Sequence, residues 1–289
     1  MRLGLHALGI GNGADRAVID AVASGADGCG FATLWAGEHV VMVDQSASRY
    51  PYSDDGVIAV PAEADWLDPM IALAFAAAAS SRIAVATGVL LLPEHNPVVV
   101  AKQAASLDRL SGGRLTLGVG VGWSREEFDA LAVPFEHRAA RTAEYAAAMR
   151  TLWRDDIASF SGKFVGFDSI RVNPKPVRSR RIPIVVGGNS DAALRRAAAW
   201  GDGWYGFNLD GVAEARKRIT KLDELCAGLN RDRRELRLAV ALRSPRVEDC
   251  EELAVLGVDE LVLVESPPDG AKAAAGWVRE LAAQWMKRP

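Results

Sequence analysis

Four histidines are the natural candidates for moving protons, because imidazole changes its charge near neutral pH. His39 follows Glu38 directly after a short apolar run, a position from which it could act as a general acid or base. A capping or surface histidine is the alternative. His6 is expected inside the protein, and His95 and His137 are expected to be structural. Since no two histidines have metal-ligand spacing on one element, we expect no metal site.

Two glycine-rich turns could bind phosphate, because glycine lets a ligand approach the backbone and a helix N-terminus presents free amides. The turn at 187–190, GGNS, combines two glycines, a hydroxyl and the start of a helix. Phosphate binding is favoured there over a plain helix cap. The turn at 118–122, GVGVG, lacks the GxGxxG spacing of a dinucleotide fingerprint, so a tight turn is an equally good interpretation.

These residues need elements to position them, and eight short apolar runs alternate with Ala-rich stretches of helical spacing. Uninterrupted apolar runs are typical of parallel strands buried on both faces. Eight strand–helix units within 289 residues favour an α/β fold, a closed (β/α)8 barrel, over an open doubly wound sheet. The expected strands are Arg2–Ala7, Thr33–Ala36, Ile83–Leu90, Leu115–Val119, Ile182–Val186, Gly203–Phe207, Leu236–Leu242 and Glu260–Val264.

Capping residues predict where three of the intervening helices begin and end. The first should run from Asn96 to Gly112, the second from Ser190 to Gly201, and the third from Ser244 to Gly257. His39 and both glycine turns then follow the C-terminal ends of strands, where barrel enzymes carry their active sites.

Two segments interrupt the alternation of strands and helices. Residues 40–65 form a long mixed loop after the second strand, and we expect it to cover the active site. Residues 155–176 alternate apolar and polar positions around two glycines, which predicts a small hairpin before the fifth strand. Because no Pro/Gly/Ser linker divides the chain, residues 1–289 are expected to form a single domain.

The composition argues against several classes of protein. A formal net charge of −3 leaves no broad basic surface for a nucleic acid. No apolar run reaches the length of about 18 residues that crosses a bilayer, and the N-terminus has no signal-peptide pattern. Three widely separated cysteines fit a reducing compartment. We therefore expect a cytoplasmic protein with a small-molecule substrate and neither a nucleic-acid nor a membrane partner.

The stretch from Ala86 to Phe128, ATGVLLLPEHNPVVVAKQAASLDRLSGGRLTLGVGVGWSREEF, resembles the core signature of the luciferase-like monooxygenase superfamily. The pieces LWAGEH and PIVVGGNSDAALRRAAAWGDGW support this, and the resemblance extends to GVDELVLVE near the C-terminus. It implies the same (β/α)8 barrel. It is closest to the subgroup of oxidoreductases that use the 8-hydroxy-5-deazaflavin coenzyme F420.

The resemblance also implies roles for matching residues. His39 would act as acid or base beside the deazaflavin ring, Glu38 would hydrogen-bond the ring, and a non-prolyl cis peptide between Gly88 and Val89 would support its back face. Trp123 stands where sugar-phosphate dehydrogenases of this family carry a glutamate, so a sugar-phosphate substrate is disfavoured. The implied coenzyme-binding residues are Glu38, Thr87, Gly88, Val89, Gly120, Trp123, Gly187, Gly188, Asn189 and Ser190, the last four for the phosphate.

The leading hypothesis is hydride transfer between deazaflavin C5 and a small, apolar organic substrate. An FMN-dependent monooxygenase that uses O2 and a partner reductase is the alternative, and a non-catalytic flavin-binding protein is a third. Many FMN-using relatives carry a tyrosine beside the arginine at the start of the fourth helix, and Arg138 has no such neighbour. The Arg-rich composition is typical of GC-rich actinobacteria, where the deazaflavin is common. Both features favour the deazaflavin.

Two further expectations concern partners. In this family the helices that correspond to Asp68–Ser80 and Pro97–Leu110 pack across a dimer axis, and their Ala-rich composition suits close approach. A homodimer is therefore favoured, with packing against the barrel as the alternative. Four aromatic residues suggest an apolar, planar substrate, although surface packing explains them equally well: Tyr50, Tyr52, Trp66 and Trp123.

Overall fold

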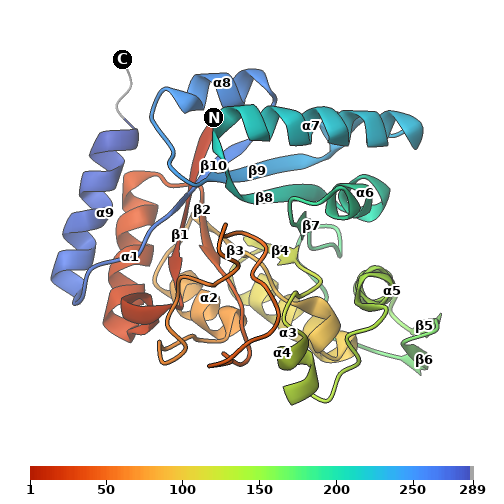
Figure 1. Cartoon of the computed structure of the whole chain (residues 1–289). Helices are drawn as coiled ribbons and strands as arrows, with labels where there is room; N and C mark the ends of the chain where they lie inside the picture. The colour runs from red at the N-terminus through yellow and green to blue at the C-terminus, as the bar shows by residue number, and fades with distance from the viewer. Residues whose placement is uncertain (287–289) are drawn as a thin grey trace.

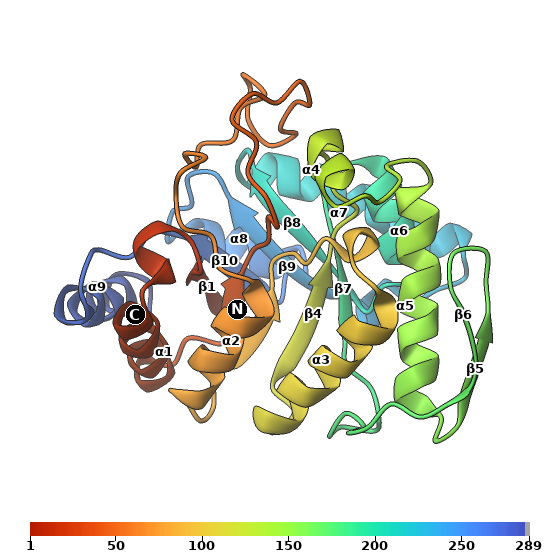
Figure 2. The same cartoon turned by 90° about the horizontal axis from the view of Figure 1, so that it is seen from below.

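Eight parallel strands close into a barrel in the order β1-β10-β9-β8-β7-β4-β3-β2 within residues 1–286, which the computed structural model describes (Figures 1 and 2). The predicted (β/α)8 barrel is confirmed. The barrel strands are β1 (Arg2–Leu8), β2 (Thr33–Ala36), β3 (Ala84–Thr87), β4 (Leu115–Val119), β7 (Ile184–Gly187), β8 (Gly203–Leu209), β9 (Arg237–Leu242) and β10 (Glu260–Val264).

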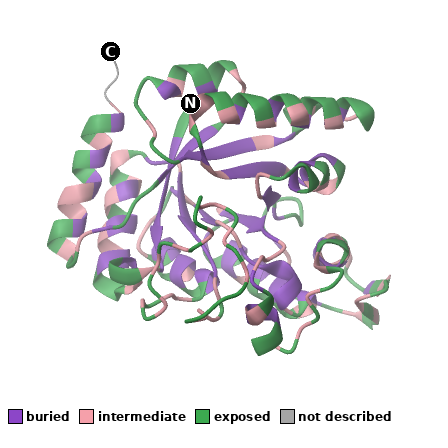
Figure 3. Ribbon diagram, in the orientation of Figure 1, coloured by how far each residue is buried: buried purple, intermediate pink, exposed green. Residues whose placement is uncertain are grey.

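The strands β2, β4 and β7 are mostly apolar and are buried at every position, because both of their faces are covered (Figure 3). One face packs on the surrounding helices. The other fills the barrel interior, where the ring of Trp35 stacks on that of Tyr205 at 4.6 Å between centroids. This arrangement gives the barrel a solid interior that supports the loops at the ends of its strands.

One expected strand is too long. Strand β3 ends at Thr87, whereas the sequence predicted that it would continue to Leu90. Beyond Thr87 the chain leaves the regular ladder, and Leu90 meets β4 only through an isolated bridge to Val119. The apolar run continues past this point because Leu90 remains buried without being part of the strand.

The helices cover the outside of the barrel, as the alternating pattern predicted (Figure 1). They are α1 (Arg16–Cys29), α2 (Pro69–Ala78), α3 (Pro97–Leu110), α4 (Arg125–Ala130), α5 (Arg138–Arg154), α6 (Asp191–Trp200), α7 (Gly211–Gly228), α8 (Asp249–Val255) and α9 (Ala271–Trp285).

The capping residues predicted two helix starts correctly and one wrongly. Asn96 caps α3, and the Ser190 hydroxyl caps α6 by accepting from the Ala193 amide at 3.2 Å. The third helix does not begin at Ser244. A turn precedes it, in which the Asp249 carboxylate accepts from the Arg246 amide at 2.8 Å, so α8 begins only at Asp249.

Both interruptions of the barrel pattern are visible. The segment between β2 and α2 is a long irregular loop that extends beyond the barrel end (Figure 2). The predicted hairpin is present as β5 (Ala158–Ser161) and β6 (Gly166–Ile170), an antiparallel pair beside α5. The Glu144 carboxylate of α5 accepts from three backbone amides of the hairpin turn, which fixes the hairpin to the helix.

None of the helices in residues 1–286 combines the length and the apolar character that crossing a membrane requires.

Candidate active site

His39 lies just beyond β2 and is held by a buried carboxylate from α4. Its Nδ1 is 2.8 Å from Oε2 of Glu127, whose side chain is only 1% exposed. The other oxygen of Glu127 accepts from the Val40 amide at 2.7 Å, which fixes the carboxylate. Because a carboxylate accepts, Nδ1 is the donor, and Nε2 is the nitrogen that can exchange a proton with a ligand.

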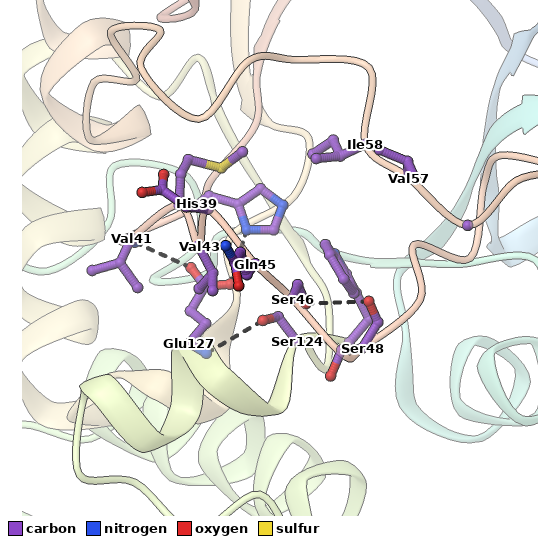
Figure 4. A pocket seen from close by; sticks show the side chains of 14 residues that line it. His39, Val41, Val43, Gln45, Ser46, Ser48, Val57, Ile58, Ser124 and Glu127 are labelled. Carbon is purple, nitrogen blue, oxygen red and sulfur yellow. Dashed lines mark hydrogen bonds and ion pairs between the residues drawn. The ribbon is translucent and has the colours of Figure 1, made fainter.

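A cavity of about 250 Å³ opens beside this pair (Figure 4). The segment 41–58 of the long loop forms one wall, and His39, Trp123, Ser124 and Glu127 form the other. The His39 ring meets the rings of Trp66 and Trp123 edge to face, at 4.9 and 5.7 Å between centroids. Apolar rings on two sides restrict the imidazole and exclude water from it.

Glu38 turns away from this cavity and binds protein groups. Its Oε2 accepts from the Leu91 amide at 2.5 Å, and its Oε1 is 3.0 Å from Nε2 of His95. Burial alone would lower the pKa of His95, but the hydrogen bond and charge of Glu38 raise it overall. His95, which the sequence suggested was structural, therefore forms a second carboxylate–imidazole pair near the first.

The segment after β3 contains the cis peptide between Gly88 and Val89 that the resemblance implied, so that prediction is confirmed. Glycines on the neighbouring strands make room for Val89. A Cβ at Gly120 would lie 2.7 Å from one methyl of Val89, and a Cβ at Gly187 would lie 2.6 Å from the other. Thr87 is buried, and its hydroxyl donates to the carbonyl of Gly118 at 2.7 Å. The structure therefore brings together most of the predicted site residues of β3, β4 and β7.

The 187–190 turn uses its side chains within the protein. The Asn189 amide group donates to the Phe207 carbonyl at 2.6 Å and accepts from the Phe207 amide at 3.1 Å, while Ser190 caps α6. Gly188 has a φ of +116°, a conformation that glycine adopts readily. What this turn offers an anion is therefore the backbone at the start of α6, rather than the Ser190 hydroxyl that the sequence highlighted.

Two arginines add positive charge near this turn. The Nε of Arg196 is buried and has no hydrogen-bond partner among the described residues. Burial and the charge of Arg138 both lower the pKa of Arg196. Arg138, the first residue of α5, donates to the Gly122 carbonyl at 3.1 Å. The charges of Arg138 and Arg196 repel each other, and the Nε–H of Arg196 has no acceptor in the described part of the chain. A bound anion would offset both charges and accept that hydrogen bond.

The long loop sends two tyrosines over the barrel end. The Tyr50 ring contacts those of Trp123 and Tyr52, and the Tyr52 ring contacts that of Phe207, all at 5.4 Å between centroids. The Asn208 side chain donates to the Tyr52 carbonyl at 2.7 Å. The loop is thus attached to both sides of the barrel mouth, at β8 and after β4.

His6 is an interior residue, as predicted. Its Nδ1 is 3.3 Å from the hydroxyl of Tyr205, and burial lowers its pKa to about 4, so its ring is neutral at physiological pH. Within residues 1–286 no group of three His, Cys, Asp or Glu side chains is arranged to hold a metal ion.

Comparison with known proteins identifies the family of this chain. The profile described as luciferase-like monooxygenase matches residues 5–284. The chain belongs to the luciferase-like monooxygenase family. An uncharacterised family relative from Mycobacterium tuberculosis is 35% identical over 273 residues, which cover 93% of this chain and 95% of the relative.

Two further similarities involve proteins whose cofactors differ. An FMNH2-dependent dimethylsulfone monooxygenase of Pseudomonas putida is 34% identical over 145 residues, which cover 49% of this chain and 39% of that protein. The structure of a coenzyme F420-dependent tetrahydromethanopterin reductase from Methanopyrus kandleri superposes with a TM-score of 0.73 at 17% identity. The match covers 96% of this chain and 97% of that one, and it shows a shared fold.

Sequence reasoning missed Glu127, Glu94 and Arg196. Glu127 has a signal, because Ser124-x-x-Glu127 is a capping-box pattern, and the Ser124 hydroxyl does accept from the Glu127 amide at 3.3 Å. That pattern predicts the start of α4 but not the partner of the glutamate. Glu127 meets His39 across 88 positions of sequence, a contact that only the folded barrel creates.

Proposed function

We propose that this protein is an oxidoreductase that transfers a hydride between C5 of the deazaflavin coenzyme F420 and a small, apolar organic substrate. His39 is its proton donor and acceptor. The observation that carries the proposal is the His39–Glu127 pair, which fixes Nδ1 and leaves Nε2 for a ligand beside an aromatic-walled cavity. When a hydride leaves or reaches the carbon of an alcohol or carbonyl group, the oxygen must lose or gain a proton, and such a proton partner supplies that exchange.

The residues present fit a flat coenzyme with a phosphate. Gly120 and Gly187 accommodate the side chain of Val89, so this side of the barrel mouth is formed by one valine and by backbone. The start of α6 and the unpaired Nε of Arg196 suit an anion. When bound, the deazaflavin would supply or accept the hydride, and the protein supplies orientation and the proton.

His39 and its neighbours would transfer the proton and keep water from the site. In alcohol oxidation Nε2 takes the hydroxyl proton, and in the reverse direction it returns that proton. Glu127 stabilises the imidazolium that forms, because its carboxylate accepts from Nδ1 throughout. Trp66 and Trp123 hold the imidazole ring edge-on and exclude water from it. The long loop covers the cavity and completes its wall.

An FMN-dependent monooxygenase is the second candidate, and the FMNH2-dependent relative favours it. Against it, the position beside Arg138 is His137, which has a φ of +61° and lies 6.2 Å from the ring of Phe164. His137 caps no helix amide and has no phenol hydroxyl for a phosphate. The deazaflavin therefore remains our choice.

Tryptophan fluorescence distinguishes the two coenzymes, because Trp123 lines the cavity and Trp66 contacts the ring of His39, which also lines it. The purified protein is titrated with the deazaflavin and, separately, with FMN. We expect quenching by the deazaflavin at far lower concentration. Tight FMN binding without deazaflavin binding would overturn the choice. A His39→Gln variant should bind the coenzyme normally and lose turnover, and full turnover in that variant would exclude His39 as the proton carrier.

We also propose that the chain acts as a single domain, in the cytoplasm, as a homodimer. The side chains of Ile71 and Phe75 on α2 and of Val99 on α3 are apolar and exposed. Neighbouring apolar side chains on adjacent helices suit a second copy of the chain. These residues lie on the helices for which the sequence suggested a dimer contact.

A further inference from the structure

Glu94 is a buried carboxyl that the proposed mechanism does not use. It ends the short 3-10 turn Leu92–Glu94, directly before His95, and is 7% exposed. Both of its oxygens are buried and have no hydrogen-bond partner among the described residues. The charged form of a buried carboxyl without a partner is strongly disfavoured, because burial removes its hydration and no hydrogen bond or ion pair replaces it.

Its surroundings add a second reason for neutrality. A Cβ at Gly122 would lie 2.9 Å from Oε1 of Glu94 and 2.5 Å from the ring of Phe128, so the carboxyl lies close to Gly122, and so does this aromatic ring. Glu127 and Glu38 both lie close enough to repel a charge on it. Burial first, and then these two carboxylates, raise the pKa of Glu94 to about 9.

The charged groups around Glu94 form two pairs. Glu127 of α4 holds His39, and Glu38 after β2 holds His95. Asp68, before α2, adds negative charge near His95. Arg138 reaches the same turn but donates to the Gly122 carbonyl. Two carboxylates are thus matched by two imidazoles, and a charge on Glu94 would have no counterpart.

We propose that Glu94 is a neutral carboxylic acid that adjoins both the Glu127–His39 and the Glu38–His95 pairs, so that its ionisation changes the electrostatic environment of both imidazoles. Glu94 is a positioning residue, since it acts on His39 through Glu127. While Glu94 keeps its proton, it adds no charge beside the two pairs. Once Glu94 ionises, its negative charge lies next to Glu127 and Glu38 and is felt by the imidazole that each of them holds. The proposal deepens the proposed function, because it concerns the proton carrier of that reaction.

The test follows the imidazole signals by NMR in protein labelled with 15N-histidine and without any coenzyme. The chain has only four histidines, so His39→Gln and His95→Gln variants assign the two signals. We expect both signals to move between about pH 8 and 10, where Glu94 ionises, and this movement to be absent in Glu94→Gln. The signals of His6 and His137 serve as internal controls.

Two results would overturn the proposal. One is identical behaviour of the His39 and His95 signals in wild type and Glu94→Gln over the whole range. The other is a displacement of both signals in Glu94→Gln already at pH 7, which would mean that Glu94 is ionised in the wild type. Glu94→Asp controls for a disturbance of the fold by the glutamine side chain. It keeps a carboxyl group, so its histidine signals should still move between about pH 8 and 10. Because no coenzyme is present, failure here is separate from failure of the deazaflavin assignment.

Discussion

The Glu94→Gln substitution should change how the stability of this protein depends on pH. Folded Glu94 keeps its proton up to about pH 9, whereas the same carboxyl in an unfolded chain loses it near 4.5. The folded state therefore binds one more proton than the unfolded state between these values. The free energy of unfolding then falls as pH rises, by about 1.4 kcal/mol per pH unit from this one group.

The glutamine variant lacks this dependence. Its amide adds a constant cost or benefit, so the informative quantity is the difference in unfolding free energy between variant and wild type at each pH. That difference should grow in favour of the variant by about 4 kcal/mol between pH 5 and pH 8. Urea unfolding followed by circular dichroism at four pH values measures it.

A matched control comes from Glu280→Gln on the exposed face of α9, for which the difference should stay constant over the same range. If the Glu94→Gln difference is equally constant, Glu94 is ionised in the folded protein. The reasoning from its burial and from the repulsion of Glu38 and Glu127 would then be wrong.

Three further substitutions test other parts of the structure. Gly120→Ala places a Cβ 2.7 Å from a methyl of Val89 and should lower the unfolding free energy by about 1–3 kcal/mol, whereas Gly28→Ala, which meets nothing within 4 Å, should not. Arg196→Gln should weaken coenzyme binding by about tenfold or more in the fluorescence titration, because it removes a charge-assisted contact to an anion. Ile71→Asp should convert the proposed dimer into a monomer in light scattering, since it places a charge on the exposed α2 face.

The sequence predicted the barrel well because its signals are local. An apolar run such as Leu115–Val119 predicts a buried strand from its own residues alone, and a cap such as Asn96 bonds amides within three residues of itself. The wrong start at Ser244 has a local cause too, since Asp249 closes a turn with Arg246 that a search for a serine–proline cap ignores.

The candidate site was predicted only in part because its contacts are not local. His39 was found by its position after a strand, but its partner Glu127 was not, because the two meet only when the fold brings the segment after β2 to α4, which follows β4. The same holds for Glu38 with His95, which are 57 positions apart. A resemblance to a family transfers individual residues and their roles, and it does not supply the carboxyl cluster that joins them.

The tyrosines of the long loop have a consequence for the rate of coenzyme binding. Tyr50 and Tyr52 form a row of ring contacts from Trp123 to Phe207 at the barrel mouth, and we expect the loop that carries them to open before a flat ring can enter. Association should then occur in two steps. At high coenzyme concentration the observed association rate would level off at the opening rate of the loop. The loop would then set the upper limit on how fast a ligand enters the barrel.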